Sequence, residues 1–322
     1  MKIHIYLDHN IVDDISKGDL SLKPSDKVVW VYSHESFAEI KRSGSPRFLD
    51  VLEDLKAVKL DLILDSNFKI TGEARFLEYR SPSEEYESYL EAISDTKLDD
   101  SSGLEFIARL FGADNKDKVT SHPQSFEENI RSLLEPHGLY DEETKLKVER
   151  IRGELEDFVA GPLQEVGGLE EARKAFGTHE GRAGNLASKE NPINELWEIV
   201  RKGVSGITAD QYFGFDPADK QGYEEWPMFL GIVGCHTMLN FLGFRPDDGL
   251  TKPSDMPGIL SDGSHIAHAA YCQGLLSRDK KFLAKARAIY RYKNIGTQVV
   301  SVEYKKGEQS QSTQKSASDL QR

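Results

Sequence analysis

The chain has 322 residues, of which 38% are hydrophobic and 30% are charged, so it can bury a sizeable core. Its formal net charge of -13 excludes a general nucleic-acid coat protein, because an acidic chain binds polyanions only through a local basic patch. With only Cys235 and Cys272 present, we expect no disulfide framework and a reducing, cytoplasmic setting. Residues 226–244 are apolar but interrupted by polar side chains, which predicts a buried helix rather than a membrane span.

The first 65 residues alternate between strand and helix signals. The run VVWVY at 28–32 is typical of a buried parallel strand, and Ser33 can cap the helix that follows. The resulting β-α-β-α-α-β order predicts an α/β fold with a doubly wound parallel sheet between two layers of helices. Strands are expected at 2–7, 28–32 and 58–64, and helices at 10–17, 34–42 and 46–56.

The middle of the chain, residues 81–257, has a different character. Its stretches are amphipathic and charged, with Gly or Pro between them, and they carry almost no strand signal. We interpret this part as an inserted α-helical subdomain, with loops at 177–185 and 251–258. Its helices are expected at 82–93, 102–111, 124–134, 142–159, 169–176 and 193–200.

Residues 258–304 return to the α/β pattern, with helices expected at 262–274 and 280–292 and strands at 275–277 and 297–302. The polar, low-complexity tail at 305–322 is expected to be disordered. We therefore expect a discontinuous core made of residues 1–80 and 258–304.

Acidic residues follow or flank the predicted strands of this core. Asp8 ends the first strand in YLDHN, Asp279 follows a strand in LLSRDKKF, and Asp262 is expected to open a helix, where the helix dipole favours its ionised form. Glu35 and Glu39 lie one turn apart on the helix after the second strand. Ligands in parallel sheets bind beyond the carboxyl ends of the strands, so we expect Asp8 and Asp279 to face one crevice.

Each of these acids also has an ordinary structural explanation. The three aspartates can cap helices, and the two glutamates can simply be solvated. Together they indicate a site for a hard divalent cation, because two carboxylates at about 4 Å repel by roughly 4 kcal/mol at an effective dielectric near 20. Oxygen ligands of this kind suit Mg²⁺ or Mn²⁺ better than zinc.

The same segments resemble the motifs of PIN domains. IYLDHNIV resembles the first motif, VYSHESFAEI the second, and SDGSHIAHAAYCQGLLSRDKKF the last two, over about 100 residues in two blocks. The resemblance implies a PIN-like fold and a Mg²⁺- or Mn²⁺-dependent endoribonuclease. It implies Asp8, Glu39, Asp262 and Asp279 as metal-binding catalytic acids, and Glu35 competes with Glu39 for the second position. A role as a toxin or defence effector would follow from the same analogy.

Neighbouring polar residues are candidates for substrate binding. His265, three residues after Asp262, can contact substrate or tune a metal ligand, and Asn10 can orient Asp8 or contact phosphate. The basic run at 278–293 can track a phosphate backbone through Lys281 and Lys285, or it can be a solvated helix face.

Other readings of the chain remain open. The pairs His268–Cys272 and Cys235–His236 have spacings usable by zinc but lie in apolar stretches, which disfavours a zinc site. The substrate is expected to be RNA or single-stranded DNA, so a DNA or flap-type nuclease is an alternative. A further alternative is a non-catalytic PIN-like module whose helical insertion binds a protein partner.

Overall fold

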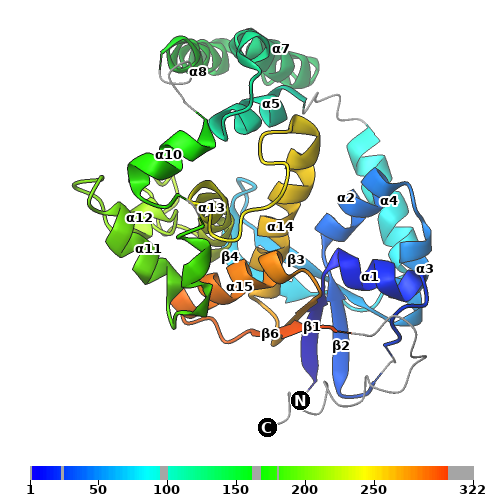
Figure 1. Ribbon diagram of the computed structural model, residues 1–322. Helices are drawn as coiled ribbons and strands as arrows, with labels where there is room; N and C mark the ends of the chain where they lie inside the picture. Colours follow the sequence, from blue (N-terminus) through cyan, green and yellow to red (C-terminus); the bar gives the residue numbers. More distant parts are fainter. Residues whose placement is uncertain (1, 23–24, 95–100, 162–167, 180, 304–322) are drawn as a thin grey trace.

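The structure is a computed structural model that describes residues 2–22, 25–94, 101–161, 168–179 and 181–303. It is an α/β fold in which a single six-stranded sheet has helices on both faces (Figure 1). The α/β class and the layered arrangement expected from the sequence are confirmed. The tail expected at 305–322 lies outside the described residues.

Five of the six strands are parallel, in the order β4-β3-β2-β1-β5-β6. The edge strand β4 runs antiparallel to β3, so the expectation of an all-parallel sheet is wrong at this edge. β4 has alternating burial along ITGEARF, as an edge strand with one solvated face does. The strands are β1 (Ile3–Leu7), β2 (Val28–Tyr32), β3 (Val58–Leu64), β4 (Ile70–Phe76), β5 (Gly274–Ser277) and β6 (Gln298–Ser301).

Alternate residues of the strands enter two separate hydrophobic cores. On one face, Tyr6, Val31 and Leu60 pack with α13 (Met228–Phe241), α14 (Met256–Ala269) and α15 (Lys280–Tyr292). On the other face, Ile5 and Leu7 pack with α1 (His9–Ser16), α2 (His34–Ser43) and α3 (Arg47–Asp54). The period of two along each strand therefore builds a three-layer molecule, with the sheet buried on both sides.

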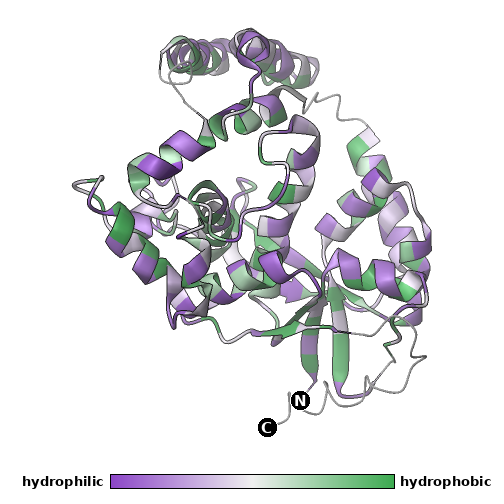
Figure 2. Cartoon of the chain, viewed as in Figure 1, coloured by the Kyte–Doolittle hydropathy of each residue, from purple (hydrophilic) through white to green (hydrophobic). Residues whose placement is uncertain are grey.

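The segment expected as an insertion, 81–257, packs in two ways. Figure 1 shows α7 and α8 far from the sheet, whereas α11 and α13 share one core with β1 and β2. α13 is apolar on almost all sides, as its hydropathy colouring in Figure 2 shows, which suits a helix enclosed by others. The helices of this segment are α4 (Pro82–Ser94), α5 (Ser101–Leu110), α6 (Lys116–Val119), α7 (His122–Leu134), α8 (Glu142–Ala160), α10 (Leu169–Phe176), α11 (Pro192–Val200), α12 (Ala209–Tyr212) and α13, with short 3-10 turns at Glu135–His137, Gly184–Ser188 and Pro253–Asp255.

The helix α14 differs most from expectation. It begins at Met256, six residues before Asp262, and ends at Ala269 rather than at 274. Pro257 lies in its first turn, where proline costs no hydrogen bond, so the stretch 251–258 is not all loop. Asp262 therefore lies in mid-helix and does not cap it.

Candidate active site

The centre of the sheet contains the topological switch point, because the chain leaves β1 toward β2 on one side and β5 toward β6 on the other. The backbone N–H of Asp8 donates to the carbonyl of Leu276 over 3.1 Å, so the carboxyl ends of β1 and β5 lie side by side. Open α/β sheets bind ligands at this place. Asp8 directly follows β1, and Asp279 comes two residues after the end of β5.

A cleft of about 470 Å³ opens at the switch point. Its lining includes Asp8, Glu39, Asp262 and Asp279, which are widely separated in the sequence. The expectation that Asp8 and Asp279 share one crevice is confirmed. The remaining lining residues are His9, Asn10, Asp13, Ser43, Ser45, Arg47, Phe48 and Phe282.

Asp8 is buried and held by several donors. One carboxylate oxygen accepts from the backbone N–H of His9 over 2.8 Å, and the other accepts from Asn10 and Ser277. Burial raises the pKa of Asp8, repulsion by Glu39 adds to this rise, and attraction to His265 only partly offsets both, so the pKa is about 6. Asp8 is thus a helix cap and also a carboxyl group whose negative charge is poorly compensated.

Asp279 caps α15 in a similar way, accepting from the backbone N–H groups of Lys281 over 2.7 Å and of Phe282 over 3.0 Å. Its own N–H donates to the hydroxyl of Ser277 over 3.0 Å, and this hydroxyl donates to Asp8. The buried Ser277 therefore links the two aspartates. The structural explanation of Asp8 and Asp279 as helix caps is correct, and both side chains also line the cleft.

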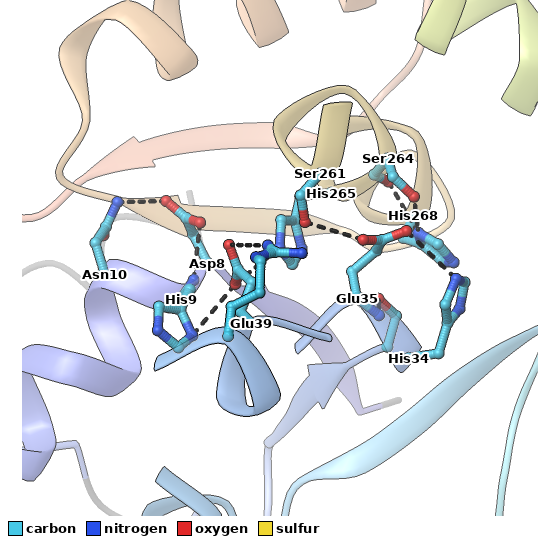
Figure 3. A network of polar contacts seen from close by, with 12 residues as sticks. Asp8, His9, Asn10, His34, Glu35, Glu39, Ser261, Ser264, His265 and His268 are labelled. Atoms are coloured by element: carbon cyan, nitrogen blue, oxygen red, sulfur yellow. Dashed lines mark hydrogen bonds and ion pairs between the residues drawn. The ribbon is translucent and has the colours of Figure 1, made fainter. Parts of the chain in front are cut away.

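Glu39 lies between two histidines, as Figure 3 shows. Its Oε2 is 3.1 Å from Nε2 of the fully buried His265 and 3.2 Å from Nδ1 of His9, and Arg42 is 3.7 Å from its other oxygen. Burial opposes ionisation of Glu39, but His265, His9 and Arg42 together outweigh burial and lower the pKa. Glu39 is therefore ionised and held at one position, and the expectation that it is merely solvated is wrong.

His265 connects this carboxylate to the sheet. Burial lowers its pKa, but Glu39 and Asp8 more than reverse the effect and raise the pKa to about 9. The imidazolium has two N–H donors, of which Nε2–H donates to Glu39 and Nδ1–H donates to the Tyr6 hydroxyl over 2.7 Å. Tyr6 then donates to Ser33 over 2.7 Å. Because His265 is fully buried, its predicted contact with substrate is wrong. It does contact Glu39, one of the acids proposed as metal ligands.

Glu35 does not line the cleft. It lies 3.3 Å from His34 and accepts from the Ser261 hydroxyl over 2.9 Å, on the far side of His265 in Figure 3. Burial raises its pKa, but the hydrogen bond and charge of His34 dominate and lower it to about 2. Of the two candidate glutamates, Glu39 is the one positioned at the cleft.

Asp262 is half-buried, and its carboxylate has no hydrogen-bond or ion-pair partner in the described part of the chain. Burial raises its pKa well above the usual range, and repulsion by Asp247 and Asp8 adds to the rise. The expectation that a helix N-terminus favours its ionised form is wrong, because Asp262 is six residues after the first residue of α14. Lys285 and His265 lower the pKa of Asp262 and only partly offset the rise.

Asp262 also belongs to a compact group with His236 and Asp247. One candidate ligand atom from each lies within 4.8 Å of the others, and no other such group of three occurs among the described residues. The buried Nε2 of His236 has no hydrogen-bond partner, and burial lowers the pKa of this histidine well below its usual value. Asp262 thus joins the cleft to a neutral imidazole and a second carboxylate.

The position of Lys285 contradicts its predicted role in contacting a phosphate backbone. It is fully buried, and its ammonium contacts Asp247 at 2.5 Å and Asn240 at 3.1 Å, so it cannot bind substrate at the surface. The helical period turns Lys285 inward with Phe282 and Ile289, while Lys281 points outward and pairs with the exposed Asp248. Arg278 pairs with Asp14 over 3.0 Å.

Several residues of the site were not found by sequence reasoning. His9 lines the cleft, and burial lowers its pKa against the opposing effect of Glu39. Its position next to Asp8 in YLDHN was the signal for it. His236 was considered only as a zinc ligand paired with Cys235, and Ser277 and Asp247 gave no signal, because only the fold brings these three residues to the acids.

Comparison with protein-family models, with curated proteins and with solved structures gives no match. Among the described residues, no helix combines the length and the apolar character that a membrane crossing requires.

Proposed function

We propose that this chain is a Mg²⁺- or Mn²⁺-dependent endoribonuclease of PIN type, with Asp8, Glu39, Asp262 and Asp279 as its acidic residues. The observation that carries the proposal is the cleft at the switch point, which these four acids line and in which the Asp262 carboxylate has no hydrogen-bond or ion-pair partner among the described residues. The PIN identity and a toxin or defence role rest on the sequence motifs.

The donor set fits a hard divalent cation. Asp8, Glu39, Asp262 and Asp279 offer carboxylate oxygens, the ligand type that Mg²⁺ and Mn²⁺ prefer. Burial, and after it repulsion by neighbouring acids, raises the pKa of Asp8 and of Asp262, and a bound cation would favour the ionised form of both. When bound, such an ion would activate water and stabilise charge on a phosphate.

The chain's own residues would prepare this site. His265 keeps Glu39 ionised and fixed, while Asn10 and Ser277 orient Asp8. His236 and Asp247 lie close to Asp262 and are further possible ligands of a divalent ion. Arg47, which lines the cleft, would attract a phosphodiester substrate.

A second candidate function is that of a non-catalytic module of the same fold. The observation that favours it is that Asp8 and Asp279 cap helices, and that the His265 imidazolium and Arg42 balance the charge of Glu39. On this account, the four acids would bind no divalent ion strongly.

Cleavage assays with RNA and single-stranded DNA, with Mn²⁺ or EDTA, separate these functions. The nuclease proposal expects Mn²⁺-dependent cleavage that Glu39→Gln reduces at least 100-fold, while the matched control Glu35→Gln retains it. RNA cleavage without DNA cleavage supports the ribonuclease, and the reverse supports a DNA or flap-type nuclease. Absence of cleavage on both substrates together with absence of Mn²⁺ binding leaves the non-catalytic module.

A further inference from the structure

A second groove lies on the other side of the first turn of α15. It has a volume of about 340 Å³ and is lined by five cationic side chains and four small or apolar ones. No aspartate or glutamate is part of this lining within the described residues. The cations are Arg245, Lys280, Lys281, Arg287 and Arg291, and the others are Ala187, Pro192, Ala284 and Ala288.

The helical period of α15 explains why the cations form one stripe. Lys280, Ala284, Arg287 and Arg291 follow one another at intervals of three or four residues, so they lie on one face of the helix. The opposite face, which includes Lys285, is buried against the sheet. The small Ala284 and Ala288 leave room between the long cationic side chains. α11 and the turn before it form the other wall.

Little within the protein neutralises this charge. Arg287 and Arg291 donate to the backbone carbonyls of Val299 and Lys189 over 3.1 and 3.4 Å, contacts that orient a guanidinium without cancelling its charge. Lys281 pairs with Asp248, whose side chain is 95% exposed, so solvent screens this pair. The chain as a whole has a net charge of -13, but the five cations make this groove locally positive.

The groove and the cleft meet at the start of α15. Asp279 and Phe282 line the cleft, while the two residues between them, Lys280 and Lys281, line the groove. A polyanion that leaves the cleft across this turn would enter the groove next. The lining contains no aromatic side chain on which a base would stack, so it offers contacts to phosphates and none to base edges.

We propose that this groove binds the sugar-phosphate backbone of a single-stranded nucleic acid whose cleaved segment lies in the cleft. The proposal rests on the proposed nuclease function and adds a second contact region. It implies that binding is independent of sequence, depends on salt, and is stronger for long strands than for short ones. In the groove, the residues that contact phosphates are Lys280, Arg287, Arg291 and Arg245, whereas the buried Lys285 makes no such contact.

The test measures binding in EDTA by fluorescence anisotropy, with labelled RNA and DNA strands of 20 nucleotides and of 4 nucleotides. The groove variant is Lys280→Ala with Arg291→Ala, both at exposed positions. The control is Lys147→Ala with Arg150→Ala, and the two side chains are 61% and 72% exposed. Both residues belong to α8, which lies far from α15 in Figure 1. Both double variants remove one lysine and one arginine, so they change the net charge equally.

We expect the groove variant to bind the 20-nucleotide strand at least 10-fold more weakly at low salt, with the control within twofold of the parent. The slope of log affinity against log salt should fall by roughly 1.4, at about 0.7 for each lost contact to a single strand. Binding of the 4-nucleotide strand should change little. Equal effects of both double variants, or a parent whose binding is insensitive to salt, would overturn the proposal.

A small activated phosphodiester, bis(p-nitrophenyl) phosphate, separates this proposal from the proposed function. It is short enough to reach only the cleft, so the groove variant should hydrolyse it in Mn²⁺ at the parent rate. If hydrolysis depends on Glu39 but strand binding ignores the groove, the groove proposal alone fails. If strand binding depends on the groove but hydrolysis ignores Glu39, the nuclease assignment fails and the groove stands.

Discussion

The Nε2 atom of His265, fully buried in α14, lies 3.1 Å from the Oε2 atom of Glu39, which lines the cleft. This pair joins a helix near the end of the chain to the helix that follows β2. It holds a carboxylate at the cleft in its ionised form, because the imidazolium lowers the pKa of Glu39.

The His265–Glu39 pair predicts a dependence of stability on pH. The pKa of His265 is about 9 in the folded protein against 6.5 for the free side chain, so folding favours the protonated form. The stabilisation is fully present below pH 6.5 and is lost as the pH rises through 9. The difference in free energy of unfolding between the parent and His265→Gln, from urea titrations, should therefore shrink by on the order of 3 kcal/mol between these pH values. A difference that stays constant from pH 6 to 9.5 would show that the pair carries no such charge.

Asp8 predicts a change of the same sign at lower pH. Its folded pKa is about 6, above the 3.8 of the free group, so folding favours the protonated carboxyl. This contribution is present below pH 3.8 and is lost as the pH rises through 6, which makes the metal-free protein less stable near neutrality. Asp8→Asn should flatten this decline, as seen in urea midpoints measured in EDTA at pH 4.5 and pH 7. Parallel pH profiles for the parent and the variant would contradict the prediction.

Lys285 is expected to matter for stability rather than for substrate. Removing its buried ammonium leaves Asp247 without its cation, so Lys285→Met should lower the free energy of unfolding by about 3–5 kcal/mol. Lys281→Met is the matched control, since its pair with Asp248 is exposed, and its stability should be close to that of the parent. Urea denaturation of both variants checks this. Equal stability of the two variants would mean that the buried pair contributes nothing.

The sequence predicted most of the secondary structure of the sheet layers because the local signals there agree. The strands β2 and β3 and the helix α15 have the expected bounds, and Ser33 caps α2 as predicted. β4 was missed because its apolar residues alternate with charged ones at a solvated edge. That alternation after a turn is itself the signal for a hairpin strand.

The candidate site was predictable in part. Asp8 and Asp279 follow strands, so local reasoning places them at the switch point. The choice of Glu39 over Glu35 depends on which side of α2 faces His265, and a spacing of one turn does not settle that. Packing of α13 against α14 and α15 buries Lys285 and brings Asp247 close to Asp262. These contacts join residues far apart in the chain, so no local sequence pattern predicts them.

The central claim is that the acids of the cleft hold a divalent cation, and a thermal melt tests it most directly. The parent and Asp262→Asn are each melted in EDTA and in Mn²⁺. We predict that Mn²⁺ raises the melting temperature of the parent, because a ligand of the folded state stabilises it by mass action. Asp262→Asn should be at least as stable as the parent in EDTA, because it removes a repelled charge, and should lose most of the Mn²⁺ response. A variant that is destabilised in EDTA and keeps the full Mn²⁺ response would contradict the account.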